Sequence, residues 1–442
     1  MLAMCTLVLL IAFLAPLIAA RVKFKDNFHP IVLASFLNLI SIVPYLFLLT
    51  IGKIQLSEKV TSHYTFTTVE ESIFKFTMVY LIGYCSLLAG MMIVSFNKKE
   101  KTNIEFLDFK KNNIRIQFFI PMIIIATLGA YLHFLNKIGG LNYLLNNLEL
   151  RAQMTSGNGY ILSAMPLMTL SILLLIYTYW KNSGLFIRML LSFLVIMNVL
   201  IETSLGGRKS TLFIIIFILL ISNYSIKKVR FLSPKVVLSI FVGSVYFVTV
   251  PILRSSGGFF ENISNLGQSM SSSLTNLFLG LSYIDHYVLI LNNFNLSNFW
   301  LGKSFLDMFF APIPSFIFPN KPPIDDGMYI RSIAEGWEVT PNSSRLDLFQ
   351  SSWPPETFGV MYLNFGIVGI ILGFFLLGYI YQKMYNAMLS SNYSFFSIYL
   401  YGFVVLNFEF SNLRIVQLLT ILSVILILYV LTELKFYKRR LI

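Results

Sequence analysis

The segment that decides the fold runs from Arg254 to Glu356 and begins with RSSGG (254–258). It ends in WPPETFG (353–359), directly before a long apolar run. Between these ends lie about a hundred mostly polar residues, including the proline-rich stretch APIPSFIFPNKPP (311–323). Segments apolar enough to span a bilayer flank it on both sides. A loop of this length is usually functional, so the sequence predicts a membrane scaffold built around one large loop.

The composition predicts a helical membrane protein. Hydrophobic residues make up 56% of the chain, charged residues make up only 12%, and Phe occurs 42 times. No soluble domain of 442 residues could bury that much apolar surface. The apolar runs are continuous rather than alternating, which excludes the strands of an outer-membrane barrel. We therefore predict an all-α, polytopic fold.

The net charge of +13 also has a membrane explanation. Short basic patches, such as RVKFK (21–25) and KRR (438–440), lie at the ends of apolar runs. This is the positive-inside pattern, so the charge gives no reason to predict binding to nucleic acid. Cys5 and Cys85 both lie in apolar runs, which argues against a disulfide bond or a thiolate nucleophile.

Apolar runs of about the length needed to cross a bilayer recur along the chain. Placing the amino terminus outside and the carboxyl terminus in the cytoplasm puts most Lys and Arg residues, but few Asp and Glu residues, on the cytoplasmic side. We therefore expect a multi-pass protein of the plasma (inner) membrane whose large loop faces outwards. The eleven predicted spans are 2–20, 30–51, 73–95, 116–135, 160–180, 185–203, 210–224, 235–253, 357–381, 394–410 and 415–433.

The predicted spans divide the chain into three parts. The first spans and their short loops occupy 1–253, the large outer loop with the expected active site occupies 254–356, and the C-terminal spans with a basic tail occupy 357–442. Within the loop, NFWLGKSFLDMFFAPIP (298–314) is aromatic and amphipathic. This pattern is typical of the interface between membrane and water. The segment could form the floor of a site for a lipid-linked substrate, or serve only as an anchor.

Several basic residues lie on the predicted outer side, where positive charge is disfavoured and needs a reason. Several such groups beside one loop could clamp an anionic diphosphate. Alternatively, each could reach the phosphates of lipid headgroups, and Arg208 could pair with Glu202. The five candidates for diphosphate binding are Arg208, Arg254, Lys321, Arg331 and Arg345.

Candidates for acid–base chemistry are fewer. Glu356 stands between two prolines and the next span, at the junction of the loop with the membrane, and is our candidate for the general base. His286 is the second candidate, although the sequence favours an ordinary surface histidine at this position. It follows Asp285, but neighbouring residues on a helix point apart and cannot form a dyad.

The remaining acidic residues give weaker signals. Asp325 and Asp326 could bind a cation, but two adjacent carboxylates are a poor metal motif, and four scattered histidines form no set of metal ligands. We therefore predict no metal and no cofactor. Glu409 and Arg414 straddle the last outer turn, where their opposite charges would neutralise each other.

Two stretches resemble the signature region of the O-antigen polymerases (Wzy), also called oligosaccharide repeat-unit polymerases. One combines WLGKSF (300–305) with APIPSFIFPNKPP (311–323), and the other is PPETFGVMYLNFGIVG (354–369). GGR (206–208) and DNFHP (26–30) resemble the same family. Ser315 departs from the family pattern, which often has Arg at that position, so no role is carried over to it.

The resemblance implies an integral-membrane, GT-C-like glycosyltransferase. Such enzymes take a polyprenyl-diphosphate-linked oligosaccharide at the outer face of the inner membrane and join its units into an O-antigen or capsule polysaccharide. They use no nucleotide sugar, and their partners are a flippase and a chain-length regulator. Two alternatives remain open. An O-antigen ligase shares this architecture, and a flippase or transporter would also be polytopic, although it usually needs charged or broken helices in mid-membrane.

Overall fold

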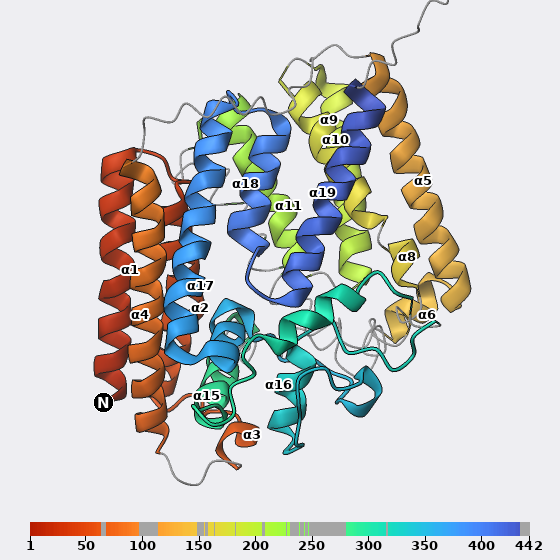
Figure 1. Cartoon of the computed structure of the whole chain (residues 1–442). Helices are drawn as coiled ribbons and strands as arrows, with labels where there is room; N and C mark the ends of the chain where they lie inside the picture. The colour runs from red at the N-terminus through yellow and green to blue at the C-terminus, as the bar shows by residue number, and fades with distance from the viewer. Residues whose placement is uncertain are drawn as a thin grey trace, which may run out of the picture. The chain divides into compact units, whose positions relative to one another are not determined.

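The structure is a computed structural model in which every regular element of the described residues is helical (Figure 1). Seven of these helices are long and apolar enough to cross a membrane. The prediction of an all-α membrane fold is confirmed at this level. The described residues are 1–62, 68–96, 114–147, 154, 158–162, 164–181, 183–205, 208–226, 228–229, 238, 243, 246, 280–314 and 317–433.

Helices occupy every range predicted as a span except 235–253, which lies outside the described residues apart from positions 238, 243 and 246. Some of the helices are too short to count as spans by length alone, so the number of eleven spans stays a prediction. These shorter apolar helices are Met165–Tyr179, Phe213–Ile226 and Phe395–Asn407.

The chain forms two compact units, each assembled from separate parts of the sequence. The first comprises Met1–Thr102, Thr275–Ala387 and Phe403–Leu419, and the second comprises Asn103–Leu274, Met388–Gly402 and Thr420–Ile442. The described part of the large loop belongs to the first unit. The helices α17 (Glu356–Ser390), α18 (Phe395–Asn407) and α19 (Asn412–Glu433) contribute to both.

The second unit is built mainly from apolar helices. Within this unit, α11 (Arg208–Ile221) and α18 pack closely through aromatic rings. The rings of Phe217 and Tyr399 stack at 4.7 Å, and a Cβ atom added to Gly402 would lie 2.5 Å from the Phe217 ring. The unit's remaining elements are α5 (Ile114–Ile138), α6 (Leu141–Asn146), α8 (Gly159–Leu162), α9 (Met165–Tyr179), α10 (Leu185–Ser204) and the π-helical turn η2 (Ser222–Ile226).

In the first unit, the DNFHP stretch fixes the turn between α1 (Leu2–Phe24) and α2 (Pro30–Thr50). His29 is the N-cap of α2, and its Nδ1 accepts a hydrogen bond from the backbone N–H of Ile31 at 3.3 Å. Pro30 follows at the first helical position, where a missing N–H is harmless. Asp26 accepts a hydrogen bond from the hydroxyl of Tyr385 on α17 at 2.7 Å. This stretch therefore joins three helices.

Glycines bring α4 (Val69–Phe96) into direct backbone contact with α17. A Cβ atom added to Gly90 would lie 2.1 Å from the carbonyl oxygen of Phe375, and one added to Gly378 would lie 2.0 Å from that of Leu87. Small residues allow membrane helices to approach this closely. The part of α17 around Phe375 and Gly378 is therefore packed directly against α4. This contact anchors the helix whose first residue is Glu356.

The helix α17 is broken at Gly366, although the sequence predicts an unbroken span over 357–381. This glycine has φ 61° and ψ −144° and separates residues 356–365, here called the α17 arm, from the rest of the helix, and the ribbon bends there (Figure 1). The carbonyl oxygens of Leu363 and Asn364 accept hydrogen bonds from the N–H groups of Trp300 and Leu301, both at 3.0 Å. The large loop thus replaces donors that a continuous helix would supply from its next turn.

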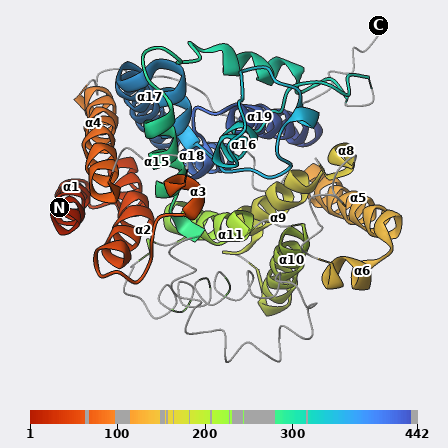
Figure 2. The same cartoon turned by 90° about the horizontal axis from the view of Figure 1, so that it is seen from below.

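The described part of the large loop folds into short helices at one end of the first unit. Met1 lies at this same end (Figure 1), and Figure 2 views the unit from below. The sequence also predicts that the amino terminus and the large loop share one side, while the side of the membrane that this end faces stays a prediction. The elements there are α3 (Glu58–Thr61), α15 (Ile284–Asn293), the 3₁₀ helix η3 (Lys303–Phe310), α16 (Gly327–Ala334) and the 3₁₀ turn η4 (Arg345–Asp347).

Candidate functional site

A pocket opens where the large loop meets the first turns of α17 and α19. Its walls come from the start of α16, from the PPE stretch that begins α17, and from the turn between α18 and α19. It gathers three carboxyl groups and one guanidinium group from distant parts of the sequence. The lining residues are Asp325, Asp326, Pro354, Pro355, Glu356, Ser411, Leu413 and Arg414.

Glu356 begins α17 with a strained backbone, because its φ of 52° is unfavourable for a residue with a Cβ atom. Its Oε2 accepts a hydrogen bond from the hydroxyl of Tyr287 on α15 at 3.0 Å. The backbone N–H of the following Thr357 donates to Glu409 Oε2 at 2.7 Å, and the Thr357 hydroxyl accepts from the Phe410 N–H at 3.0 Å. These contacts fix the carboxylate at the pocket and maintain its unusual backbone.

Arg414 lies in the first turn of α19 and presents a guanidinium group to the pocket. Its Nη1 donates to Asn407 Oδ1 and to Gln417 Oε1, both at 2.8 Å. Both acceptors are neutral amides, which orient the guanidinium without cancelling its charge. Glu409, which the sequence suggests as the charge partner of Arg414, accepts the Thr357 N–H.

Asp326 is a buried carboxyl group in the wall of the pocket, with 3% of its surface exposed. Its Oδ2 accepts from the backbone N–H of Asn412 at 2.8 Å, and its Oδ1 accepts from Asn412 Nδ2 at 3.0 Å. Burial is the largest cause that raises the pKa of Asp326 to about 8; the nearby carboxyl groups of Asp325 and Asp307 contribute to this rise, and the Asn412 N–H opposes it. Asp326 therefore keeps its proton near neutral pH.

This raised pKa predicts a dependence of stability on pH. Through Asp326, the folded protein binds one proton that the unfolded chain has lost between about pH 4 and pH 8, so the contribution of this group to stability falls as the pH rises through this window. One such group changes the free energy of unfolding by about 1.4 kcal/mol per pH unit. Unfolding temperatures measured from pH 5 to about pH 9 should decline for the native protein and decline less steeply for Asp326→Asn.

The comparison uses the slopes and not the absolute stabilities, because an Asn at position 326 would place an NH₂ group against a donor of Asn412. The neighbouring Asp307, Asp325, Glu356 and Arg414 are the same in both proteins and cancel from the difference. Equal slopes would show that Asp326 does not bind the additional proton.

The second predicted acid–base residue, His286, lies on α15 behind the pocket wall and is not among the lining residues. Its ring stacks on Trp353 at 4.8 Å, with the planes 17° apart, and its Nδ1 lies 3.0 Å from the carbonyl oxygen of Pro354. In this position the histidine supports the segment that delivers Glu356. Its catalytic role stays a prediction.

Two predicted diphosphate ligands of the large loop are engaged elsewhere or exposed. Lys321 is 9% exposed, its ammonium group donates to the carbonyl oxygen of Ile313 at 2.5 Å, and burial lowers its pKa. Arg345 is exposed on η4, and its backbone N–H donates to the Lys321 carbonyl at 3.1 Å. The structure therefore places neither side chain in the pocket lining.

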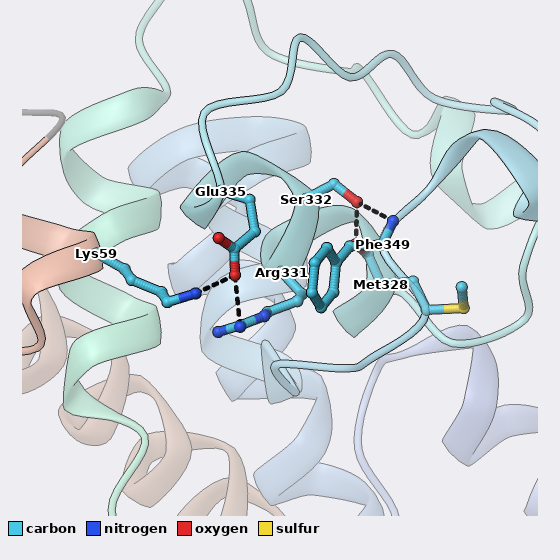
Figure 3. Close-up of polar contacts among 6 residues, drawn as sticks. All are labelled: Lys59, Met328, Arg331, Ser332, Glu335 and Phe349. Atoms are coloured by element: carbon cyan, nitrogen blue, oxygen red, sulfur yellow. Dashed lines mark hydrogen bonds and ion pairs between the residues drawn. The ribbon is translucent and has the colours of Figure 1, made fainter. Parts of the chain in front are cut away.

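Arg331 lies on α16 among charged and aromatic side chains (Figure 3). Its guanidinium carbon is 4.9 Å from the centroid of the Phe349 ring and 5.1 Å from that of Trp353, within range of cation–π attraction. Its Nη2 lies 2.5 Å from Glu335 Oε1, which also pairs with Lys59 of α3. The guanidinium that the sequence assigns to a diphosphate is thus engaged by a carboxylate and two rings.

The helix α16 also holds residues 349–354, the segment that leads to the pocket. The Ser332 hydroxyl donates to the Met328 carbonyl and accepts from the Phe349 N–H, both at 2.9 Å (Figure 3). Four residues later, the Trp353 N–H donates to the Gly327 carbonyl at 2.9 Å. These contacts make α16 the support for residues 349–354, which precede Glu356.

The two remaining predicted ligands are Arg208 and Arg254. Arg208 is the first residue of α11, as expected for a residue at the end of a span, but the position of its side chain is not described. Arg254 lies outside the described residues. Their roles at a diphosphate stay predictions.

The sequence does not predict that Arg414 and Asp326 line the same pocket as Glu356. Arg414 was assigned only to charge neutralisation, and Asp326 only to a weak metal motif. The sequence does mark both places: Pro354 and Pro355 stand just before α17, and Asn412 and Arg414 stand at the start of α19. Nothing in the order of the chain says that these two places meet.

The described residues include no group of three or more His, Cys, Asp or Glu side chains that could hold a metal ion. Comparisons with models of protein families, with curated proteins and with solved structures find no match to this chain.

Proposed function

We propose that this protein polymerises polyprenyl-diphosphate-linked oligosaccharides into a surface polysaccharide, as the resembled O-antigen polymerases do. The observation that supports the proposal most directly is the pocket that places Glu356 beside Arg414 at the ends of apolar helices. A substrate with a lipid tail and a polar head would reach such a position along the membrane surface. The fork of a guanidinium group suits a diphosphate, and a fixed carboxylate suits proton transfer.

The proposed reaction moves one glycosyl group from the carrier to an acceptor. Glu356 takes the proton of the acceptor hydroxyl, whose oxygen forms a bond to the anomeric carbon of the donor. The bond between that carbon and the diphosphate oxygen breaks, and the polyprenyl diphosphate leaves with the bonding electrons. Arg414 stabilises the negative charge that develops on this leaving group.

The other two carboxyl groups of the pocket differ in charge. The raised pKa of Asp326 keeps this group protonated near neutral pH, so it adds no repulsion. Asp325 accepts the backbone N–H of Gly327 with its Oδ1 at 3.0 Å, a hydrogen bond that leaves the negative charge of the carboxylate in place. Among the described residues that line the pocket, Arg414 is the one cation, so the proposed contact with a diphosphate depends on it.

The proposal is tested with purified protein in proteoliposomes that contain lipid-linked repeat units. A ladder of longer saccharides should form without added nucleotide, and EDTA should not stop it. Transfer only onto a lipid A core would assign the protein to the ligases. Movement of the substrate across the bilayer with no new glycosidic bond would assign it to the transporters.

A further inference from the structure

The 3₁₀ helix η3 buries polar side chains and exposes apolar ones, which is the reverse of a helix on the surface of a soluble protein. Residues three apart are eclipsed in a 3₁₀ helix, so its side chains form ridges with a period of three. One ridge, Ser304 and Asp307, is fully buried in the protein, although both side chains are polar. The ridge of Leu306 and Phe309 is exposed, with 52% and 66% of their surfaces accessible. Apolar groups thus point outwards and polar groups inwards.

The inward polar groups have protein partners, so water is not needed on that side. Asp307 Oδ2 accepts from the Tyr329 hydroxyl at 2.7 Å. The Ser304 hydroxyl and Asn364 Nδ2 are hydrogen-bonded at 2.9 Å, and the Ser304 carbonyl accepts from Asn412 Nδ2 at 2.6 Å. Since these bonds satisfy the buried face, the outward direction of Leu306 and Phe309 is fixed by the fold.

The exposed ridge continues the apolar surface of a membrane helix. The chain just before η3 is hydrogen-bonded to the α17 arm at Leu363 and Asn364, and a Cβ atom on Gly302 would lie 3.1 Å from the ring of Phe365. Beyond the break, Val368 of α17 is 63% exposed. Lys303 begins the exposed ridge of η3, where a long cationic side chain can reach headgroup phosphates.

From this arrangement we infer that η3 and the α17 arm form a membrane seat, defined here as residues 299–310 and 356–365, whose exposed apolar ridge contacts the acyl chains of the bilayer. The occupant is lipid because the ridge is continuous with the exposed surface of α17, an apolar helix long enough to cross a membrane. The arm is ten residues long, and a helix of that length spans about 15 Å, so the seat would hold the pocket near the headgroups.

The experiment measures the depth of a fluorophore attached to single cysteines. The parent protein carries Cys5→Ala and Cys85→Ala, and an NBD group is placed on Phe309→Cys or on Leu306→Cys. The matched control is Leu346→Cys, because Leu346 of η4 is 65% exposed and belongs to the same loop but not to the seat. Each labelled protein is reconstituted in phosphatidylcholine vesicles and confirmed as monodisperse before reconstitution.

Spin-labelled phosphatidylcholine should quench the two seat labels several-fold more than the control label, and aqueous iodide should show the opposite order. Quenching by iodide of all three labels to the same extent would overturn the seat. Two labelled positions in the seat are used so that a local effect of one substitution can be recognised by comparison with the other. This outcome does not depend on catalysis, so failure of the seat and failure of the proposed function are distinguishable.

Discussion

Polymer formation is expected to fall by about two to four orders of magnitude in Glu356→Gln, because this change removes the proposed base while keeping the size of the side chain. The Tyr287 hydroxyl can still donate to the amide oxygen, so the local structure should persist. The measurement is the initial rate of product formation in proteoliposomes at saturating lipid-linked donor. The loss should appear in kcat and not mainly in KM, since proton transfer belongs to the chemical step.

The matched control for this variant is Glu338→Gln. Glu338 is an exposed glutamate of the same loop and does not line the pocket. Its substitution should leave the rate unchanged within a factor of about two, as is usual for a surface change without partners. Full activity of Glu356→Gln would remove this residue as the base and make His286 the next residue to test.

The long apolar helices could be predicted from the sequence because each depends on local properties. Continuous apolar runs of about twenty residues mark α1, α2, α4 and α10 without reference to the rest of the chain. The break in α17 could not be predicted in this way. Its Gly366 resembles the other glycines of an apolar run, and what permits the break is the pair of hydrogen bonds from residues 300 and 301.

Of the predicted site residues, Glu356 lines the pocket, and its role there stays a prediction. Glu356 could be singled out because prolines and an apolar run mark it as a junction residue. Arg331 and Lys321 were chosen for their charge, but charge alone does not reveal that Glu335 and two aromatic rings engage one, or that a backbone carbonyl engages the other. Asp326 and Arg414 line the same pocket as Glu356 only because of tertiary contacts, such as the hydrogen bonds from Asn412 of α19 to Asp326.

Arg414 is the second residue for which a large effect is expected. Removing its charge in Arg414→Gln should reduce kcat/KM for the lipid-linked donor by about two to three orders of magnitude, the usual consequence of losing about 2 to 4 kcal/mol of charge-assisted stabilisation. Arg414→Lys should retain part of the activity, because Lys keeps the charge but loses the planar fork. Inorganic diphosphate should also inhibit the native protein more strongly than either variant.

The structural contribution of Arg414 must be separated from its role in the reaction. Its Nη1 bonds to Asn407 and Gln417 join α18 to α19, so both variants are first compared with the native protein by their unfolding temperatures. The matched control is Arg188→Gln, because Arg188 is an exposed arginine of α10 that does not line the pocket and bonds through its Nε to the Trp180 carbonyl. If a stably folded Arg414→Gln protein polymerised the donor as fast as the control, the leaving diphosphate would have to be stabilised by other cations, and Arg208 and Arg254 would become the first candidates.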